Sequence, residues 1–187
     1  MSNLDEPIMQ PESVPMRPLA LRYGLLTALA LFVIGLALQF SGLVDPVARK
    51  GNWISYLFTL AIFFGGIYIA IREYKKESGN TITFGRALGF GTLTVAIICL
   101  AGMVLNYLHF AFIDPGMIDQ IRNASIAQME ERGMDETQIE QAMKFTKMFT
   151  SPIAMSIFGA IFSFIMGFIV TLIAGGIHQN AKPAQTV

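Results

Sequence analysis

Four long runs of apolar residues, separated by short polar segments, dominate the pattern along this chain. They cover Leu19–Leu43, Trp53–Ile71, Phe84–Phe112 and Pro152–Ile177. Within them only Arg22 and Arg86, each near the start of a run, carry a full charge. A helix rises about 1.5 Å per residue, so about 20 residues cross a hydrocarbon layer about 30 Å thick. Each run therefore predicts a membrane-spanning helix, because lipid offers the backbone amides no partner outside their own segment.

The one sizeable polar segment between these runs, residues 114–151, predicts two short helices. The first covers Met117–Arg132 and ends at Gly133, a residue that favours a left-handed stop. The second opens with a capping box formed by Asp135 and Gln138. Its apolar positions recur at helical spacing and form one stripe: Ile139, Ala142, Met143, Thr146 and Phe149. We expect this amphipathic insertion to cover the bundle, lie in the membrane interface or dock a partner, in that order of preference.

The predicted fold class is all-α, an integral membrane four-helix bundle with a short amphipathic helical insertion between the third and fourth spans. Residues 19–178 form the predicted membrane domain. Residues 1–18 are polar, acidic and rich in proline, and we expect them and residues 179–187 to be disordered tails. We expect no cleavable secretory signal, because such a signal begins with basic residues.

The composition agrees with a lipid environment. Charged residues make up 14% of the chain, against about 25% in soluble domains. A charge in the middle of a bilayer costs roughly 2.5–3.5 kcal/mol on the insertion scale, which accounts for this deficit. Thirteen basic and thirteen acidic residues cancel, so we expect the lipid bilayer and no nucleic acid as a partner. The single cysteine, Cys99, cannot form an intrachain disulfide.

The basic residues favour an orientation with both termini in the cytoplasm. With the N-terminus inside, that side holds seven basic residues and the other side six. Short loops carry most of the positive-inside signal, and the segment between the second and third runs is rich in basic residues. These are Arg72, Lys75, Lys76 and Arg86. They could also bind anionic lipid headgroups, but their role in topology is the favoured interpretation.

Small residues recur four positions apart in the fourth run and therefore share one helix face. They are Gly159, Ser163, Gly167, Thr171 and Gly175, and Gly85 and Gly89 repeat the pattern in the third run. Helices in lipid associate through close contact and hydrogen bonds, which small residues allow. We favour helix packing, within the monomer or across a homo-oligomer, over a groove for a lipid or small substrate.

Asn106 and His109, about one helical turn apart, are weak candidates for a polar site. A histidine can relay protons or bind a metal, but no second histidine, cysteine or carboxylate lies close by in the sequence. We therefore favour hydrogen-bonded interfacial side chains, and expect no metal, cofactor or catalytic residue. The sequence has no P-loop, no G-x-S-x-G and no H-E-x-x-H motif.

Several short motifs together resemble a known family. They are Arg22-Tyr23-Gly24-Leu25, Ile71-Arg72-Glu73-Tyr74-Lys75, Ile82-Thr83-Phe84-Gly85-Arg86-Ala87-Leu88, Gly133-Met134-Asp135-Glu136 and Ser151-Pro152. From Leu19 to Ile177 the chain resembles a bacterial four-span membrane protein family catalogued only as a domain of unknown function (DUF family four-one-nine-nine). The Phe-Gly-x-Ala segment after the basic loop is the most specific part. The resemblance implies residence in the bacterial inner (cytoplasmic) membrane, and it carries over no activity.

Two functions stay open on the sequence alone. The leading hypothesis is a non-enzymatic integral membrane protein that acts through helix packing or contacts with a membrane protein partner in the bacterial envelope. The alternative is a small transporter or channel-like protein, for which polar residues of the spans must converge on a hydrated path. These residues are Gln39, Thr92, Asn106 and Ser163. A membrane enzyme ranks last, since no nucleophile–base pair is visible.

Overall fold

The computed structural model describes residues 15–45 and 52–180, in which every regular element is a helix. Four long helices form a bundle: α1 (Met16–Phe40), α2 (Asn52–Glu77), α3 (Phe84–Leu108) and α6 (Pro152–His178). Two shorter helices, α4 (Met117–Glu131) and α5 (Glu136–Phe149), connect α3 to α6. A π-helical segment, His109–Ile113, prolongs α3. The prediction of an all-α chain with four spans is confirmed.

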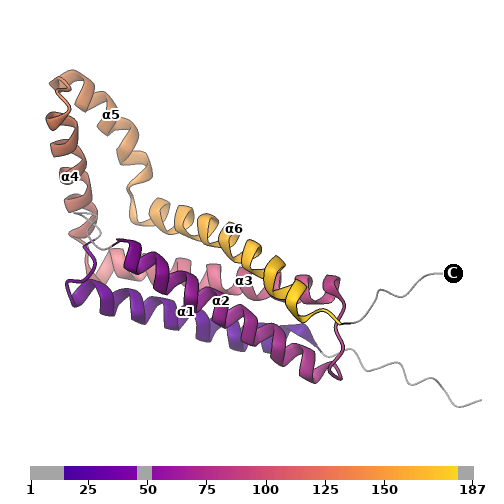
Figure 1. Ribbon diagram of the computed structural model, residues 1–187. Helices are drawn as coiled ribbons and strands as arrows, with labels where there is room; N and C mark the ends of the chain where they lie inside the picture. Colours follow the sequence, from indigo (N-terminus) through magenta and orange to yellow (C-terminus); the bar gives the residue numbers. More distant parts are fainter. Residues whose placement is uncertain (1–14, 46–51, 181–187) are drawn as a thin grey trace, which may run out of the picture.

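The four long helices lie side by side and alternate in direction. Helix α3 contacts α6 and α1 most extensively, and α2 closes the bundle against α1 and α6. Both ends of the described chain lie at one end of the bundle, and α4 and α5 stand at the other (Figure 1). All four helices are long and apolar enough to cross a membrane, which indicates a multi-pass membrane protein in a lipid bilayer.

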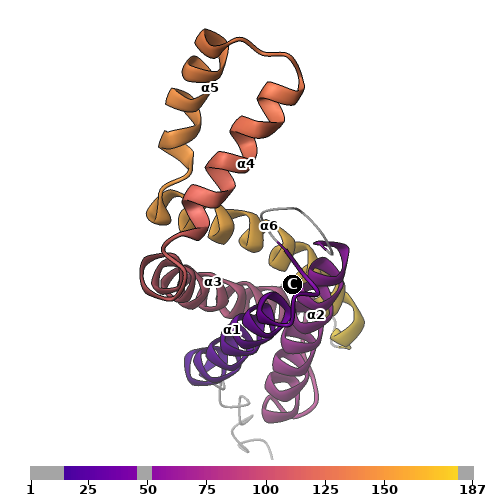
Figure 2. The same cartoon turned by 90° about the vertical axis from the view of Figure 1, so that its left-hand side faces the viewer.

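The hairpin formed by α4 and α5 does not cover the bundle, which was the arrangement ranked first from the sequence. Seen from the hairpin end, it extends sideways beyond the outline of the four long helices (Figure 2). Its base is fixed by Arg122, whose guanidinium donates to the hydroxyl and the carbonyl oxygen of Thr150 at 2.9 and 2.6 Å. These bonds join α4 to the residue that ends α5, just before α6 begins, and so hold the two helices of the hairpin together at its base.

Local signals set the two helices of the hairpin as predicted. Gly133 adopts a positive φ of 75° directly after α4. In the capping box, the Asp135 carboxylate accepts from the Gln138 amide at 2.8 Å, and the Gln138 side chain accepts from the Asp135 amide at 3.1 Å. These bonds satisfy donors that the first turn of α5 would otherwise leave free.

Threonine and glycine bring the long helices close together in the half of the bundle near the termini. Thr27, Thr94 and Thr171 are buried, and each hydroxyl donates to the carbonyl four residues earlier, at 2.7 to 2.9 Å. A Cβ added at Gly66 would strike Thr27, and one added at Gly91 would strike Thr171. Because the hydroxyls are satisfied within their own helices, the threonine side chains can pack directly against glycine backbones of neighbouring helices.

The small-residue face of α6 is divided between two environments. Gly167, Thr171 and Gly175 are buried, and a Cβ added at Gly167 would lie 2.7 Å from Val95 Cγ1. At Gly159, by contrast, an added Cβ would meet no atom within 4 Å. Close contact therefore extends along only part of this face.

Gly85 and Gly89 do not pack against the other helices of this bundle, so contact across a homo-oligomer is the part of their predicted packing role that stays a prediction. Both residues are exposed, and a Cβ added at either would meet no atom within 4 Å. The inward face of α3 instead carries Ala87, Phe90 and Gly91, all buried. Gly89 lies two residues before Gly91, on the opposite side of the helix, so the glycine spacing alone did not identify the face that packs within the bundle.

Hydrogen bonds fasten the end of α6 to the connection between α2 and α3. Asn180 accepts from the Ile82 amide at 3.0 Å, and its own amides donate to the carbonyl oxygens of Ile82 and Asn80 at 3.1 and 2.8 Å. Lys75 Nζ donates to the carbonyl oxygen of His178 at 2.9 Å and places a cation at the C-terminus of α6.

Some helix ends differ from the predicted borders. Helix α1 begins at Met16, before the predicted start at Leu19, and α2 continues to Glu77 past the last apolar residue. The predicted borders follow the apolar residues and therefore stop at the first charged ones. The helices continue past these borders because backbone hydrogen bonding does not require apolar side chains. Asn180 was predicted to belong to a disordered tail, but it is held by the bonds to Ile82 and Asn80. The remaining tail predictions, for residues 1–14 and 181–187, lie outside the described residues.

We expect Gly167→Leu to lower the stability of the bundle by about 1–3 kcal/mol, as overpacking of a filled interior does. The new side chain would press on Val95 and Phe63, which lie 2.7 and 3.0 Å from an added Cβ. Thermal unfolding in detergent measures the effect. The matched control is Gly89→Leu, which enters open space on α3. Equal unfolding temperatures for the two variants would contradict this account of the α3–α6 contact.

Candidate functional site

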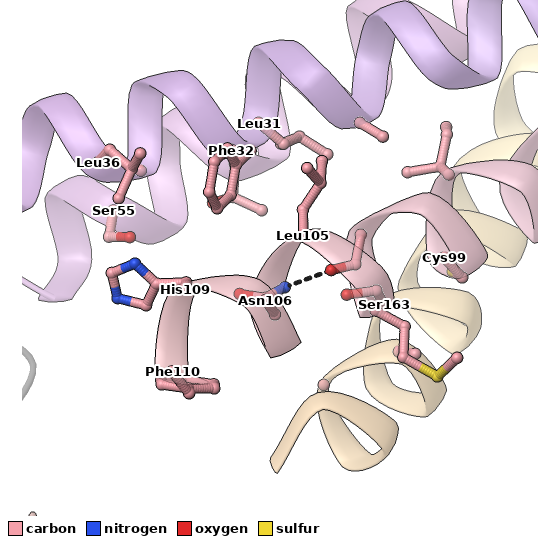
Figure 3. A pocket seen from close by; sticks show the side chains of 18 of the residues that line it. Leu31, Phe32, Leu36, Ser55, Cys99, Leu105, Asn106, His109, Phe110 and Ser163 are labelled. Carbon is pink, nitrogen blue, oxygen red and sulfur yellow. Dashed lines mark hydrogen bonds between the residues drawn. The ribbon is translucent and has the colours of Figure 1, made fainter. Parts of the chain in front are cut away.

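The half of the bundle nearer the hairpin contains a cavity of about 330 Å³ between the four long helices (Figure 3). Glycines widen it: Gly35, Gly102 and Gly159 line the cavity, and a Cβ added at any of them would meet no atom within 4 Å. Pockets that hold small molecules have volumes of about 300–1,000 Å³. We therefore take this cavity as the candidate functional site.

The cavity ends near the middle of the bundle. Its deepest lining residues include Phe63, Ile98 and Cys99, which are all buried. Farther toward the termini, Ile67 and Val95 have no exposed surface and fill the interior. The site therefore lies in the half of the bundle near the hairpin, and apolar side chains close it toward the other half.

The polar groups of the lining are uncharged amides and hydroxyls together with one histidine. They belong to Gln39, Ser55, Thr59, Asn106, His109 and Ser163. The Gln39 amide donates to Asp114 Oδ2 at 3.3 Å, and this bond links the end of α1 to the residue that follows the π-helical segment. Asn106 Nδ2 donates to the carbonyl oxygen of Gly102 at 2.9 Å, within its own helix. This lining suits a molecule that is mostly apolar and carries a few hydrogen-bonding groups.

His109 lies at the start of the π-helical segment, a backbone feature often found at functional sites. Its side chain is buried, with 5% of the residue exposed, and its ring meets Phe32 and Phe110 edge-on at centroid distances of 6.4 and 5.4 Å. Within the described chain, Nδ1 has no hydrogen-bond partner. The structure therefore differs from the predicted hydrogen-bonded interfacial histidine: the ring is buried and belongs to the cavity wall.

The structure brings together only some of the predicted site residues. Asn106 and His109 line the cavity together with Gly159 and Ser163. Gly167, Thr171 and Gly175 belong to the close α3–α6 contact, and Gly85 and Gly89 lie on the outside. Sequence reasoning missed Ser55 and Thr59, whose spacing of four residues in an otherwise apolar span marks one polar helix face.

The second histidine, His178, has a structural position at the opposite end of the bundle. Its Nδ1 lies 2.9 Å from the carbonyl oxygen of Ala174, and its ring meets Tyr68 at a centroid distance of 4.3 Å. Among the described residues, 15–45 and 52–180, no three histidine, cysteine, aspartate or glutamate side chains form a group that could hold a metal ion. The cavity near His109 is therefore the site that the described residues present for a ligand.

No curated protein and no solved structure matches this chain. A family model does match, over residues 22–180, and its description reads "Protein of unknown function (DUF4199)". The matched region includes nearly all of the four long helices, the whole hairpin and every residue that lines the cavity. Because the match covers far more than half of the chain and confirms the resemblance seen in the motifs, the protein belongs to this family of unknown function.

Proposed function

We propose that the protein is a non-enzymatic protein of the bacterial cytoplasmic membrane that acts through contacts made at the hairpin end of its bundle. The observation that supports this proposal is the sideways projection of the α4–α5 hairpin (Figure 2), whose helix α5 also carries exposed apolar side chains. Phe145 and Met148 on α5 are 68% and 64% exposed. Exposed apolar groups of this size, next to charged ones, are typical of interaction surfaces.

Exposed apolar and charged groups lie next to each other on α5. Glu140 and Lys144 form an exposed ion pair at 3.0 Å, Met148 follows Lys144 one turn later, and Phe145 projects from a different side of the helix. The hairpin runs across the direction of the bundle (Figure 1), so in a membrane it lies roughly along the surface. Helices placed there keep their charged side in water and bury the apolar side at the headgroup boundary. We propose that Phe145 and Met148 meet a neighbouring membrane protein or a second copy at this level.

We further propose that both termini face the cytoplasm. The connection between α2 and α3 lies at the same end of the bundle as the two ends of the described chain (Figure 1), and the helices beside it carry the exposed Arg72, near the end of α2, and Arg86, in the first turn of α3. In the last turn of α2, Lys76 pairs with Glu73, and Lys75 Nζ donates to the carbonyl oxygen of His178 at the end of α6. A dense basic connection of this kind favours the cytoplasmic side. The hairpin, and the half of the bundle that contains the cavity, then lie toward the outer side of the membrane.

A second candidate function, a small transporter, is favoured by one observation. Of the four polar residues that a hydrated path requires, Gln39, Asn106 and Ser163 line the cavity, whereas Thr92 does not. Against this candidate, the apolar layer that includes Ile67 and Val95 fills the bundle beyond the cavity. A transporter would have to open this layer during its cycle.

We expect the wild-type chain, purified in mild detergent from native membranes, to retain a stable membrane protein partner or a second copy. The double variant Phe145→Asp with Met148→Asp should lose most of the bound partner, because two charges cannot enter an apolar contact without a large desolvation cost. The control exchanges the ion pair, Glu140→Lys with Lys144→Glu, and should keep the partner. Retention by the first variant, or a wild type that runs alone, would contradict the proposal.

The proposed orientation predicts which side of the membrane a thiol reagent reaches. In a Cys99→Ser background, Gln141→Cys on the hairpin should react with a membrane-impermeant maleimide in intact spheroplasts. Lys76→Cys, in the last turn of α2, should react only after lysis. Both positions are exposed, so access depends on the side of the membrane and not on burial. The reverse labelling pattern would place the termini outside.

Flux measurements separate the two candidate functions. We expect proteoliposomes to release small trapped solutes no faster than protein-free liposomes, because apolar side chains close the cavity at mid-bundle. Protein-dependent flux that falls in Asn106→Leu and Ser163→Leu, but not in Thr92→Val, would instead establish the transporter. The Thr92 variant is the control because this residue lies outside the cavity lining.

A further inference from the structure

Three hydroxyl groups in the lining of the cavity bond no other group among the described residues. They belong to Ser55, Thr59 and Ser163. The buried hydroxyls elsewhere in the long helices behave differently, since each donates to the carbonyl oxygen four residues earlier. They are those of Thr27, Thr94, Ser156 and Thr171. The hydroxyls of the cavity therefore need a partner that the helices do not supply.

Two of these hydroxyls are open to the space that they line. Among the described residues that are not exposed, the side-chain polar atoms that are both enclosed and unbonded are Ser78 Oγ and His109 Nδ1. Ser55 and Ser163 are half-buried, and their unbonded oxygens are not enclosed. Figure 3 shows both serines, with Asn106, around the same space between the helices. A water-sized molecule therefore reaches these oxygens, whereas it does not reach His109 Nδ1.

Two amide side chains add hydrogen-bond acceptors to the lining. The nitrogens of Gln39 and Asn106 donate to Asp114 and to the carbonyl oxygen of Gly102, at 3.3 and 2.9 Å. The side-chain oxygens of both amides bond no group among the described residues. A hydroxyl both donates and accepts, whereas an amide oxygen only accepts. The lining thus suits a small molecule that does both, as water does.

The three hydroxyls extend from the hairpin end of the bundle to its middle. Ser55 lies in the first turn of α2, and Ser163 lies near the middle of α6. Because α6 is long and apolar enough to cross a membrane, its middle lies within the hydrocarbon layer. The cavity volume of about 330 Å³ sets an upper bound of about ten water molecules, at about 30 Å³ each. The polar groups therefore lie at depths where lipid offers them no partner.

We propose that the cavity holds a cluster of water molecules in one half of the membrane, bonded to the hydroxyls of Ser55, Thr59 and Ser163. An interior water makes about three hydrogen bonds, so it joins groups of α2, α3 and α6 that do not bond one another. Apolar side chains close the cavity at mid-bundle, so this water forms no path across the membrane. The proposal is independent of the contact proposed for α5 and requires no transport.

The test uses Cys99, the single cysteine of the chain, which lines the cavity. A thiol hydrogen exchanges with D₂O only where water reaches it, and infrared absorption separates S–H from S–D. The full-length protein in nanodiscs is transferred to D₂O. The matched comparison is Val95→Cys in a Cys99→Ser background, because Val95 lies one turn earlier on α3 and has no exposed surface. We expect exchange at Cys99 to be at least about tenfold faster, since position 95 exchanges only when the bundle opens.

A second comparison keeps the native Cys99 and removes the groups that hold the water. The triple variant Ser55→Ala, Thr59→Val, Ser163→Ala makes the cavity more apolar, and apolar cavities stay dry. We expect exchange at Cys99 to become about tenfold slower in this variant. The control is Thr92→Val, which removes a hydroxyl of α3 outside the cavity lining and should leave the exchange rate unchanged. Thermal unfolding in detergent shows whether each variant is folded.

Three outcomes would overturn the proposal. Slow exchange at both Cys99 and the Val95→Cys position would show that the cavity is dry. Fast exchange at both positions would show that the thiols report opening of the whole bundle and not water in the cavity. Exchange at Cys99 that the triple variant leaves unchanged would show that the lining hydroxyls do not hold the water.

Discussion

In hydrocarbon, every polar group of a helix must find its partner within the protein, and this constraint shapes the whole bundle. The buried threonines satisfy it locally, because each hydroxyl bonds the carbonyl one turn earlier. Their side chains are then free to pack against Gly66 and Gly91, and the helices approach closely without polar contacts between them. Where the chain leaves the lipid, the pattern changes, and Asn180 and Lys75 bond across helices at the end of the bundle.

The two halves of the bundle differ because small residues have opposite effects in them. Near the termini, Gly24 and Gly167 receive side chains of neighbouring helices, and the interior is filled. Near the hairpin, no side chain of a neighbouring helix packs against Gly35 or Gly102, so the missing side chains of these glycines leave the cavity open. The π-helical segment then turns His109 toward this space. A tight half holds the helices together, so the other half can remain open for a ligand without loss of the fold.

The sequence predicts the elements well and the site only in part. Apolar runs locate the four spans because crossing lipid demands length and hydropathy, and both can be read from composition. The capping box at Asp135 and the stop at Gly133 are local, so they too could be predicted. Which face of a helix turns inward is decided by its neighbours, and for this reason glycine spacing selected Gly89 although Gly91 makes the contact. The burial of His109 escaped prediction for the same reason.

The most extensive contact in the bundle, between α3 and α6, joins helices that the hairpin separates along the chain. A ribosome adds about 5–20 residues per second, so α3 exists for seconds before its main neighbour is made. During that interval the surface of α3 at Gly91, which Thr171 of α6 later covers, faces lipid or the insertion machinery. Assembly must therefore end with α6. A chain that stops short of Asn180 would lack the hydrogen bonds that join the end of α6 to Ile82 and Asn80 in the α2–α3 connection.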